Sequence, residues 1–275
     1  MKILDELAAA ARRIETPCGE GAMVWRVWNV DAGSPLVLLH GGSGSWRHWV
    51  RQVSRYARER CVIAPDLPGL GESAMPEEPH DPPHVASITV EGLASVLGGR
   101  RADLVGFSFG ANVAGHVAAD LGPAIRSLLL LGAGSLGMPR NAVTLEKVRD
   151  KQGEARVAAH RFNLHSLMIA DPARIDALAL AIQDWNTVHA RFRSRGFANA
   201  ALLKEALART SIPLAVVWGE RDQVAAGHIP ERIAAVREVR PDATAEVIPS
   251  AGHWTQYEAP EAFDAVMEHF QRGVR

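Results

Sequence analysis

The sequence predicts an α/β protein whose mostly parallel central sheet is covered by helices on both faces. Near-continuous apolar strands are typical of such sheets, because helices cover both sides. Regular alternation of strands and helices indicates a doubly wound arrangement. Six short apolar segments have the length of buried strands: 36–39, 61–64, 104–105, 128–131, 214–218 and 245–248. Segments of helical length lie between or after them, at about 46–58, 87–97, 111–121, 230–239 and 260–271.

A further pair of strands is expected near the N-terminus. Residues 24–30 alternate between apolar and polar side chains, which fits a half-exposed antiparallel strand at the sheet edge. Their expected partner is 12–16, reached through a turn at 17–21 that is rich in proline and glycine.

The composition is that of a globular protein without an excess of charge. The chain has 275 residues, of which 47% are hydrophobic and 22% charged, and its formal net charge is −1. This balance offers no electrostatic basis for binding nucleic acid or an acidic membrane surface. No apolar run approaches the roughly 20 residues of a membrane-spanning helix, and no signal peptide is apparent. The two cysteines, Cys18 and Cys61, do not suggest a disulfide framework. We therefore expect a cytoplasmic monomer or homodimer that acts on a small molecule, with no nucleic-acid or membrane partner.

The alternation of strands and helices breaks between residues 135 and 210. This segment contains no convincing strand, and residues 145–148, 175–182 and 200–207 have helical composition. An insertion of helices between two strands is expected to cover the carboxyl edge of the sheet, where α/β proteins bind ligands. The sequence thus predicts a core domain, residues 1–134 and 211–275, and a helical cap, residues 135–210.

The strongest functional signal is a serine at a strand–turn–helix junction. Residues 106–110 have the pattern G-x-S-x-G, after the apolar run 102–105 and before the small-residue run 111–115. Such a turn holds its serine in a strained conformation with Oγ exposed. The flanking glycines are needed because a side chain there would collide with the neighbouring helix or strand. Ser108 is therefore the predicted nucleophile.

A serine hydroxyl needs a general base, and the base needs a carboxylate to orient it. After such a turn, the acid and then the histidine follow along the chain. Asp222 comes just after one apolar strand and His253 just after the last, so both are expected at the same sheet edge as Ser108. Asp222 could instead cap a helix or lie on the surface, and Glu220 could be the acid.

Two features of the loop after residues 36–39 bear on the same site. His40 is interpreted as a structural histidine that braces loops rather than as the base. The glycine-rich residues 41–44 offer exposed backbone N–H groups, and the N–H groups of Gly42 and Phe109 are the natural pair to bind an oxyanion. A phosphate site is not favoured, because neither the P-loop pattern nor the third glycine of a dinucleotide fingerprint is present.

These motifs resemble those of the α/β-hydrolase superfamily over nearly the whole chain. The markers, in order, are residues 38–42, 66–73, 106–110, 218–222 and 252–258. The resemblance implies a mostly parallel eight-stranded sheet with helices on both faces and an inserted helical cap. It also implies Ser108 as nucleophile, His253 as base and Asp222 as acid, with Gly42 and Phe109 as the oxyanion hole. It implies no metal and no organic cofactor. One departure is that the proline usual a few residues after the acid is absent from 223–226.

The subfamily is less clearly marked. His253 and Trp254 followed by Gln256 resemble carbon–carbon bond hydrolases that act on ring-cleavage products. Those enzymes tend to carry Asn before the serine, where this chain has Phe107, and a proline-containing glycine loop, where it has 43–45. Dehalogenases and epoxide hydrolases of this superfamily use an aspartate nucleophile, which Ser108 argues against.

The sequence therefore predicts a serine hydrolase, resembling carboxylic ester hydrolases, that cleaves a small ester or related carbonyl compound through an acyl-enzyme. One alternative is a C–C bond hydrolase of vinylogous diketones, and another is a non-catalytic ligand-binding receptor on the same fold. Aromatic residues near the site suggest an apolar pocket, and a cap arginine could bind a substrate carboxylate. The predicted substrate contacts are Trp46, Phe107, Trp185, Arg191 and Trp254.

Overall fold

The computed structural model describes residues 2–274 and contains one eight-stranded sheet with strand order β1-β2-β4-β3-β5-β6-β7-β8. Strands β3 to β8 run parallel, whereas β2 is antiparallel to both β1 and β4. This confirms the predicted mostly parallel sheet. The strands are β1 (Arg12–Cys18), β2 (Gly21–Trp28), β3 (Leu36–Leu39), β4 (Val62–Pro65), β5 (Ala102–Phe107), β6 (Ile125–Leu131), β7 (Leu214–Gly219) and β8 (Thr244–Ile248).

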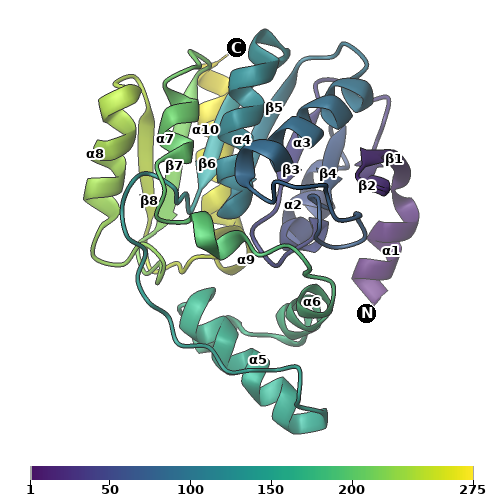
Figure 1. Ribbon diagram of the computed structural model, residues 1–275, viewed down its shortest axis with the longest axis vertical. Helices are drawn as coiled ribbons and strands as arrows, with labels where there is room; N and C mark the ends of the chain where they lie inside the picture. Colours follow the sequence, from purple (N-terminus) through teal and green to yellow (C-terminus); the bar gives the residue numbers. More distant parts are fainter. Residues whose placement is uncertain (1, 275) are drawn as a thin grey trace.

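Helices cover both faces of this sheet (Figure 1). Alternate strand residues point to opposite sides, and each side packs with different helices into its own apolar cluster. One layer contains α3 (Pro82–Leu97), α4 (Phe109–Leu121), α7 (Leu202–Leu207) and α8 (Ile229–Val239). The other contains α1 (Lys2–Ala10), α2 (Val50–Tyr56) and α10 (Pro260–Gly273). The doubly wound arrangement is therefore confirmed.

The strand expected at the edge of the sheet lies inside it. β2 is paired on both sides, by β1 and β4, and its last six residues are buried, so the prediction of a half-exposed edge strand is wrong. The edge strand is β1. The misleading polar residue is Arg26, which is buried and forms an ion pair with Glu72.

Helix α3 begins five residues before its predicted start at residue 87. The Asp81 side chain accepts a hydrogen bond from the His84 backbone N–H at 2.9 Å, and Pro82 occupies the first helical turn. An aspartate cap followed by proline is a common helix start, because proline has no N–H to leave unpaired there.

The chain between β6 and β7 contains α5 (Gly153–Leu167), α6 (Ala177–Val188), α7 and two short 3-10 helices. Helices α5 and α6 lie away from the sheet, beyond the end where α9 (Thr255–Glu258) is seen (Figure 1). Helix α7 instead packs on α4, where a Cβ on Gly115 would meet the Leu203 side chain. Residues 145–148, expected to be helical, have no regular structure. The division into core and cap domains stays a prediction.

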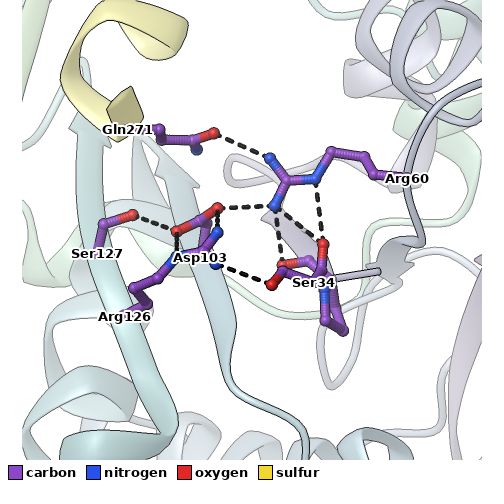
Figure 2. Close-up of polar contacts among 7 residues, drawn as sticks. Ser34, Arg60, Asp103, Arg126, Ser127 and Gln271 are labelled. Atoms are coloured by element: carbon purple, nitrogen blue, oxygen red, sulfur yellow. Dashed lines mark hydrogen bonds and ion pairs between the residues drawn. The ribbon is translucent and has the colours of Figure 1, made fainter. Parts of the chain in front are cut away.

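A buried carboxylate ties together the amino ends of the central strands (Figure 2). Asp103, at the start of β5, is fully buried and accepts hydrogen bonds from Arg60, Arg126 and Ser127. Arg60 also donates to Gln271 of α10, at 2.9 Å. These donors hold the pKa of Asp103 below its ordinary value although burial alone would raise it.

Candidate active site

Ser108 occupies a strained turn between β5 and α4. Its φ of 54° and ψ of −114° are unusual for a residue with a side chain. A Cβ on Gly106 would lie 2.4 Å from the Gly110 carbonyl oxygen, and one on Gly110 would lie 2.4 Å from the His40 carbonyl oxygen. The turn therefore requires glycine on both sides of the serine, as the sequence pattern predicts.

His253 connects Ser108 to Asp222. Its Nε2 lies 2.9 Å from Ser108 Oγ, and its Nδ1 lies 2.7 Å from Asp222 Oδ2. Because an ionised carboxylate only accepts hydrogen bonds, Nδ1 carries the proton and Nε2 accepts from the serine hydroxyl. His253 and Asp222 are both buried, so water does not compete for the bond between them, whereas Ser108 is half-buried. The three residues that follow β5, β7 and β8 thus meet at one edge of the sheet.

Backbone groups hold the Asp222 carboxylate in place. Its Oδ1 accepts from the N–H groups of Val224, at 2.8 Å, and Ala225, at 3.3 Å. This turn forms without the proline that the family resemblance leads one to expect. Glu220 points elsewhere, where its carboxylate accepts from the Ser250 N–H at 2.8 Å. Of the two carboxylates considered, it is Asp222 that contacts the histidine.

A cavity of about 130 Å³, here called the serine cavity, contains this arrangement. Gly42 and Phe109 line it together with Ser108 and His253, and their role as the oxyanion hole stays a prediction. Helix α5 contributes Asn163 and Leu167 to its wall, and α6 contributes Gln183. A second cavity of about 510 Å³ shares four of these lining residues: Ser43, Leu145, Asn163 and Gln183.

Of the five predicted substrate contacts, Phe107 lines the serine cavity. Its ring centroid lies 5.0 Å from that of His253 and 5.6 Å from that of His48. Phe107 therefore also limits the movement of the His253 ring.

The other four predicted contacts lie outside the serine cavity. Trp46 and Trp254 are fully buried in the apolar cluster that includes residues of α2 and α10, and the Trp254 indole donates to the His48 carbonyl oxygen at 2.9 Å. Trp185 stacks on the Arg47 guanidinium at 3.5 Å, and Arg191 donates to the carbonyl oxygens of Gly71 and Ser73. The expectation that these residues contact substrate is not supported, because packing and backbone hydrogen bonds occupy them.

His40 braces two loops, as predicted. Its Nε2 accepts from the Leu67 N–H at 2.9 Å, so the proton sits on Nδ1, which donates to the Gly41 carbonyl at 2.8 Å. Burial lowers the pKa of His40 to about 4, and it also lowers that of His48 well below its ordinary value. Both rings are therefore neutral near pH 7, and neither is the imidazole bonded to Ser108, which is that of His253.

Sequence reasoning did not identify several polar residues of the serine cavity, Asn112, Ser135, Arg140, Asn163 and Gln183 among them. Asn112 carried a signal, because it lies one helical turn after Ser108 in the motif region. The others come from loops or from α5 and α6, and only the folded chain brings them to the serine. Among the described lining residues, Arg140 is the only Lys or Arg, and none is Asp or Glu.

Two further structural properties concern metals and membranes. Within residues 2–274, no group of three or more His, Cys, Asp or Glu side chains is placed to hold a metal ion. In the same range, no helix has the length and apolar character needed to cross a membrane.

Comparison with known proteins identifies related sequences and structures. A model described as the alpha/beta hydrolase family matches residues 36–266. The chain is 33% identical over 265 residues to the dihydrolipoyllysine-residue acetyltransferase component of the acetoin cleaving system of Pseudomonas putida, covering 90% of this chain. It spans only 66% of that relative's length.

Two other similarities extend over nearly the whole of both partners. The chain is 25% identical over 288 residues to the 2-hydroxy-6-oxononadienedioate/2-hydroxy-6-oxononatrienedioate hydrolase of Comamonas testosteroni, covering 91% of this chain and 93% of the relative. The crystal structure of an esterase from Rhodococcus sp. ECU1013 matches with a TM-score of 0.77 at 25% identity, covering 97% of this chain and all of the other.

Proposed function

The chain belongs to the α/β-hydrolase family, and we propose that it is a serine hydrolase that cleaves a small ester or related carbonyl compound. The observation that carries this proposal is the chain of contacts from Ser108 Oγ through His253 to Asp222, at 2.9 and 2.7 Å. These distances are those expected of a nucleophile, its general base and the group that orients the base. The similarity to an esterase supports the same class.

In the proposed reaction, Ser108 Oγ attacks the substrate carbonyl carbon while His253 Nε2 takes its proton. Asp222 holds the imidazole in the required tautomer and stabilises the imidazolium that forms. The N–H groups of Gly42 and Phe109 stabilise the oxyanion. His253 then protonates the leaving group. In the second step, His253 takes a proton from water, which attacks the acyl-serine carbonyl, and His253 returns that proton to Ser108 Oγ as the acid is released.

The dimensions of the two cavities favour a small acyl group. The serine cavity, at about 130 Å³, is smaller than the roughly 300 Å³ at which pockets for drug-sized ligands begin. The neighbouring cavity of about 510 Å³ offers room for the rest of the substrate. We propose that α5 and α6 act as the cap, since Asn163, Leu167 and Gln183 from these helices form part of the wall of the serine cavity.

The charge of the serine cavity favours neutral or anionic substrates. Arg140 contributes a positive charge to the wall, and no acidic side chain among the described lining residues balances it. A cationic acyl group would meet repulsion there, whereas a carboxylate would be attracted.

Two of the relatives support other reactions for the same active site. The Comamonas testosteroni relative is a hydrolase of dienedioates, which supports C–C bond cleavage as the second candidate. The Pseudomonas putida relative is an acetyltransferase component, and an acyl-enzyme could pass its acyl group to a thiol instead of water. Both alternatives retain the Ser108 acyl-enzyme chemistry and differ in the bond cleaved or in the acceptor.

Labelling with a fluorophosphonate probe tests the nucleophile. We expect the wild-type protein to label and the Ser108→Ala variant not to label, whereas Ser95→Ala, which removes an exposed serine on α3, labels normally. Equal labelling of wild type and Ser108→Ala would show that Ser108 is not the nucleophile. Absence of labelling in the folded wild type would favour a non-catalytic ligand-binding receptor.

A substrate panel then separates the enzymatic alternatives. Short-chain esters, dienoate ring-cleavage products and acetyl thioesters with a dithiol acceptor would be compared by kcat/KM. Ester hydrolysis should dominate. Rapid dienoate cleavage with weak esterase activity, or acyl transfer to the thiol in preference to water, would replace the esterase assignment.

A further inference from the structure

We propose that Asn112 selects substrates whose acyl group carries a hydrogen-bond donor, a hydroxyl or an N–H, on the second or third carbon. This inference rests on the proposed function, because it names the substrate class of the same serine. It concerns an acceptor in the cavity wall that the reaction steps described above do not use.

Asn112 lies in the first turn of α4, close to the nucleophile. Its backbone N–H approaches the Ser108 carbonyl oxygen at 3.4 Å, so the two residues are one helical turn apart. Asn112 lines the serine cavity and is only 3% exposed. A rise of about 6 Å over four helical residues places its side chain within reach of the first few carbons of an acyl group on Ser108.

The orientation of the Asn112 amide follows from its neighbours. Ser135 Oγ lies 2.7 Å from the Phe197 carbonyl oxygen, which can only accept, so the single hydroxyl proton of Ser135 goes to Phe197. Ser135 Oγ also lies 2.8 Å from the side-chain amide of Asn112, and in this contact it must be the acceptor. The amide atom of Asn112 that faces Ser135 is therefore Nδ2, and Oδ1 points away from Ser135.

Asn112 Oδ1 is a buried acceptor without a donor among the described residues. Burying a carbonyl oxygen without a hydrogen bond is unfavourable, and such groups are rare in folded proteins. Because Asn112 is part of the cavity wall, the proposal assigns this missing partner to a donor on a substrate bound in the serine cavity. A leucine would fill the same space without this penalty if packing were the only requirement.

Matching hydroxyacyl and plain acyl esters provides the test. The substrates are ethyl lactate, ethyl 3-hydroxybutanoate, ethyl butanoate and ethyl 3-methoxybutanoate, in which the methoxy group keeps an acceptor but has no donor. We expect the wild-type kcat/KM for at least one hydroxyacyl ester to exceed that for ethyl butanoate by about tenfold or more, because a buried acceptor is otherwise left unpaired. The methoxy ester should be no better than ethyl butanoate.

Two variants assign the preference to Asn112. In Asn112→Leu, the ratio of kcat/KM for hydroxyacyl over plain ester should fall to near one. In Ser135→Ala, the amide is no longer held with Nδ2 toward Ser135, so the ratio should fall and the methoxy ester should gain relative to ethyl butanoate. A ratio measured on one preparation does not depend on the fraction of active molecules, so partial misfolding cannot imitate the result.

The outcomes separate this inference from the proposed function. A wild-type protein that labels with fluorophosphonate and hydrolyses esters, but shows no hydroxyacyl preference, overturns the role of Asn112 and leaves the serine hydrolase assignment intact. A hydroxyacyl preference that persists in Asn112→Leu also overturns the role of Asn112 and leaves the serine hydrolase assignment intact. A wild type that neither labels nor hydrolyses any ester overturns both.

Discussion

Gly132 lies directly against the imidazole of His253, so that a Cβ on Gly132 would be 2.9 Å from His253 Cε1. Gly132 follows β6 and has a φ of +59°, which residues with side chains rarely adopt. The absence of a side chain here sets how far the histidine ring can approach the turn after β6. The position of the predicted general base therefore depends on a glycine outside the sequence motifs.

Substituting Gly132 should impair the site without removing any of its reactive groups. We expect Gly132→Ala to lower kcat and the rate of fluorophosphonate labelling by about 100-fold, because small displacements of a catalytic group carry large costs. The control is Gly33→Ala in the exposed turn before β3, where a new Cβ would meet nothing within 4 Å. Equal losses in both variants would contradict a role for Gly132 in placing His253.

The two carboxylates after β7 should differ in importance. In Asp222→Asn the amide oxygen can keep the bonds that Oδ1 accepts from the backbone, so the NH2 group faces His253 Nδ1 and favours the wrong imidazole tautomer. We expect kcat to fall by about 10⁴-fold, the loss typical of such a change. Glu220→Gln alters a carboxylate that contacts the Ser250 N–H instead, and should change kcat by less than about tenfold. The reverse order of effects would identify Glu220 as the acid. Steady-state kinetics of the two variants decide the matter.

His40 should make the protein less stable as the pH falls. Burial lowers the pKa of His40 to about 4, from 6.5 when exposed, so between these values the unfolded chain binds a proton that the folded chain does not. The free energy of unfolding should therefore decrease as the pH drops from 6.5 toward 4, by up to about 3 kcal/mol.

Denaturant titrations of wild type and His40→Gln at pH 7 and pH 5 measure this contribution. Other groups also titrate, including buried Asp66, whose raised pKa acts in the opposite direction. The difference between the two proteins isolates His40, and it should shrink as the pH falls. A difference that does not vary with pH would show that His40 is not held neutral.

Loss of the buried carboxylate in Figure 2 should destabilise the fold. Asp103→Asn removes the charge that compensates Arg60 and Arg126, and we expect about 3 kcal/mol less free energy of unfolding. Asp242→Asn breaks the ion pair of a largely exposed carboxylate with Arg240 and should cost less than about 1 kcal/mol. Because Asp103 lies at the amino end of β5, opposite Ser108, kcat per folded molecule should not change. A selective loss of kcat in Asp103→Asn would mean that the network also positions the site.

Strand positions could be predicted because short apolar runs bounded by turn residues are typical of strands that helices cover on both faces. The edge strand could not be identified in the same way, since Arg26 makes β2 look exposed. Its burial depends on Glu72, which lies 46 residues away in the sequence. Helix α3 was expected too late because Asp81 and Pro82 look like a loop when their capping contact is not visible.

By itself, the sequence determined the α/β fold class and, in local motifs, the residues that meet at the candidate site. Ser108, Asp222 and His253 could be chosen because each follows an apolar strand, and parallel strands end at one edge of a sheet. Only the tertiary structure decided which carboxylate contacts His253 and which side chains line the cavity. Trp46 and Trp254 proved to be buried in an apolar cluster and not to line the cavity, whereas Asn112 and Arg140 line it. The reason is physical: the positions of strands along the chain follow from the hydrophobic pattern, whereas the direction of a side chain depends on partners far away in the sequence.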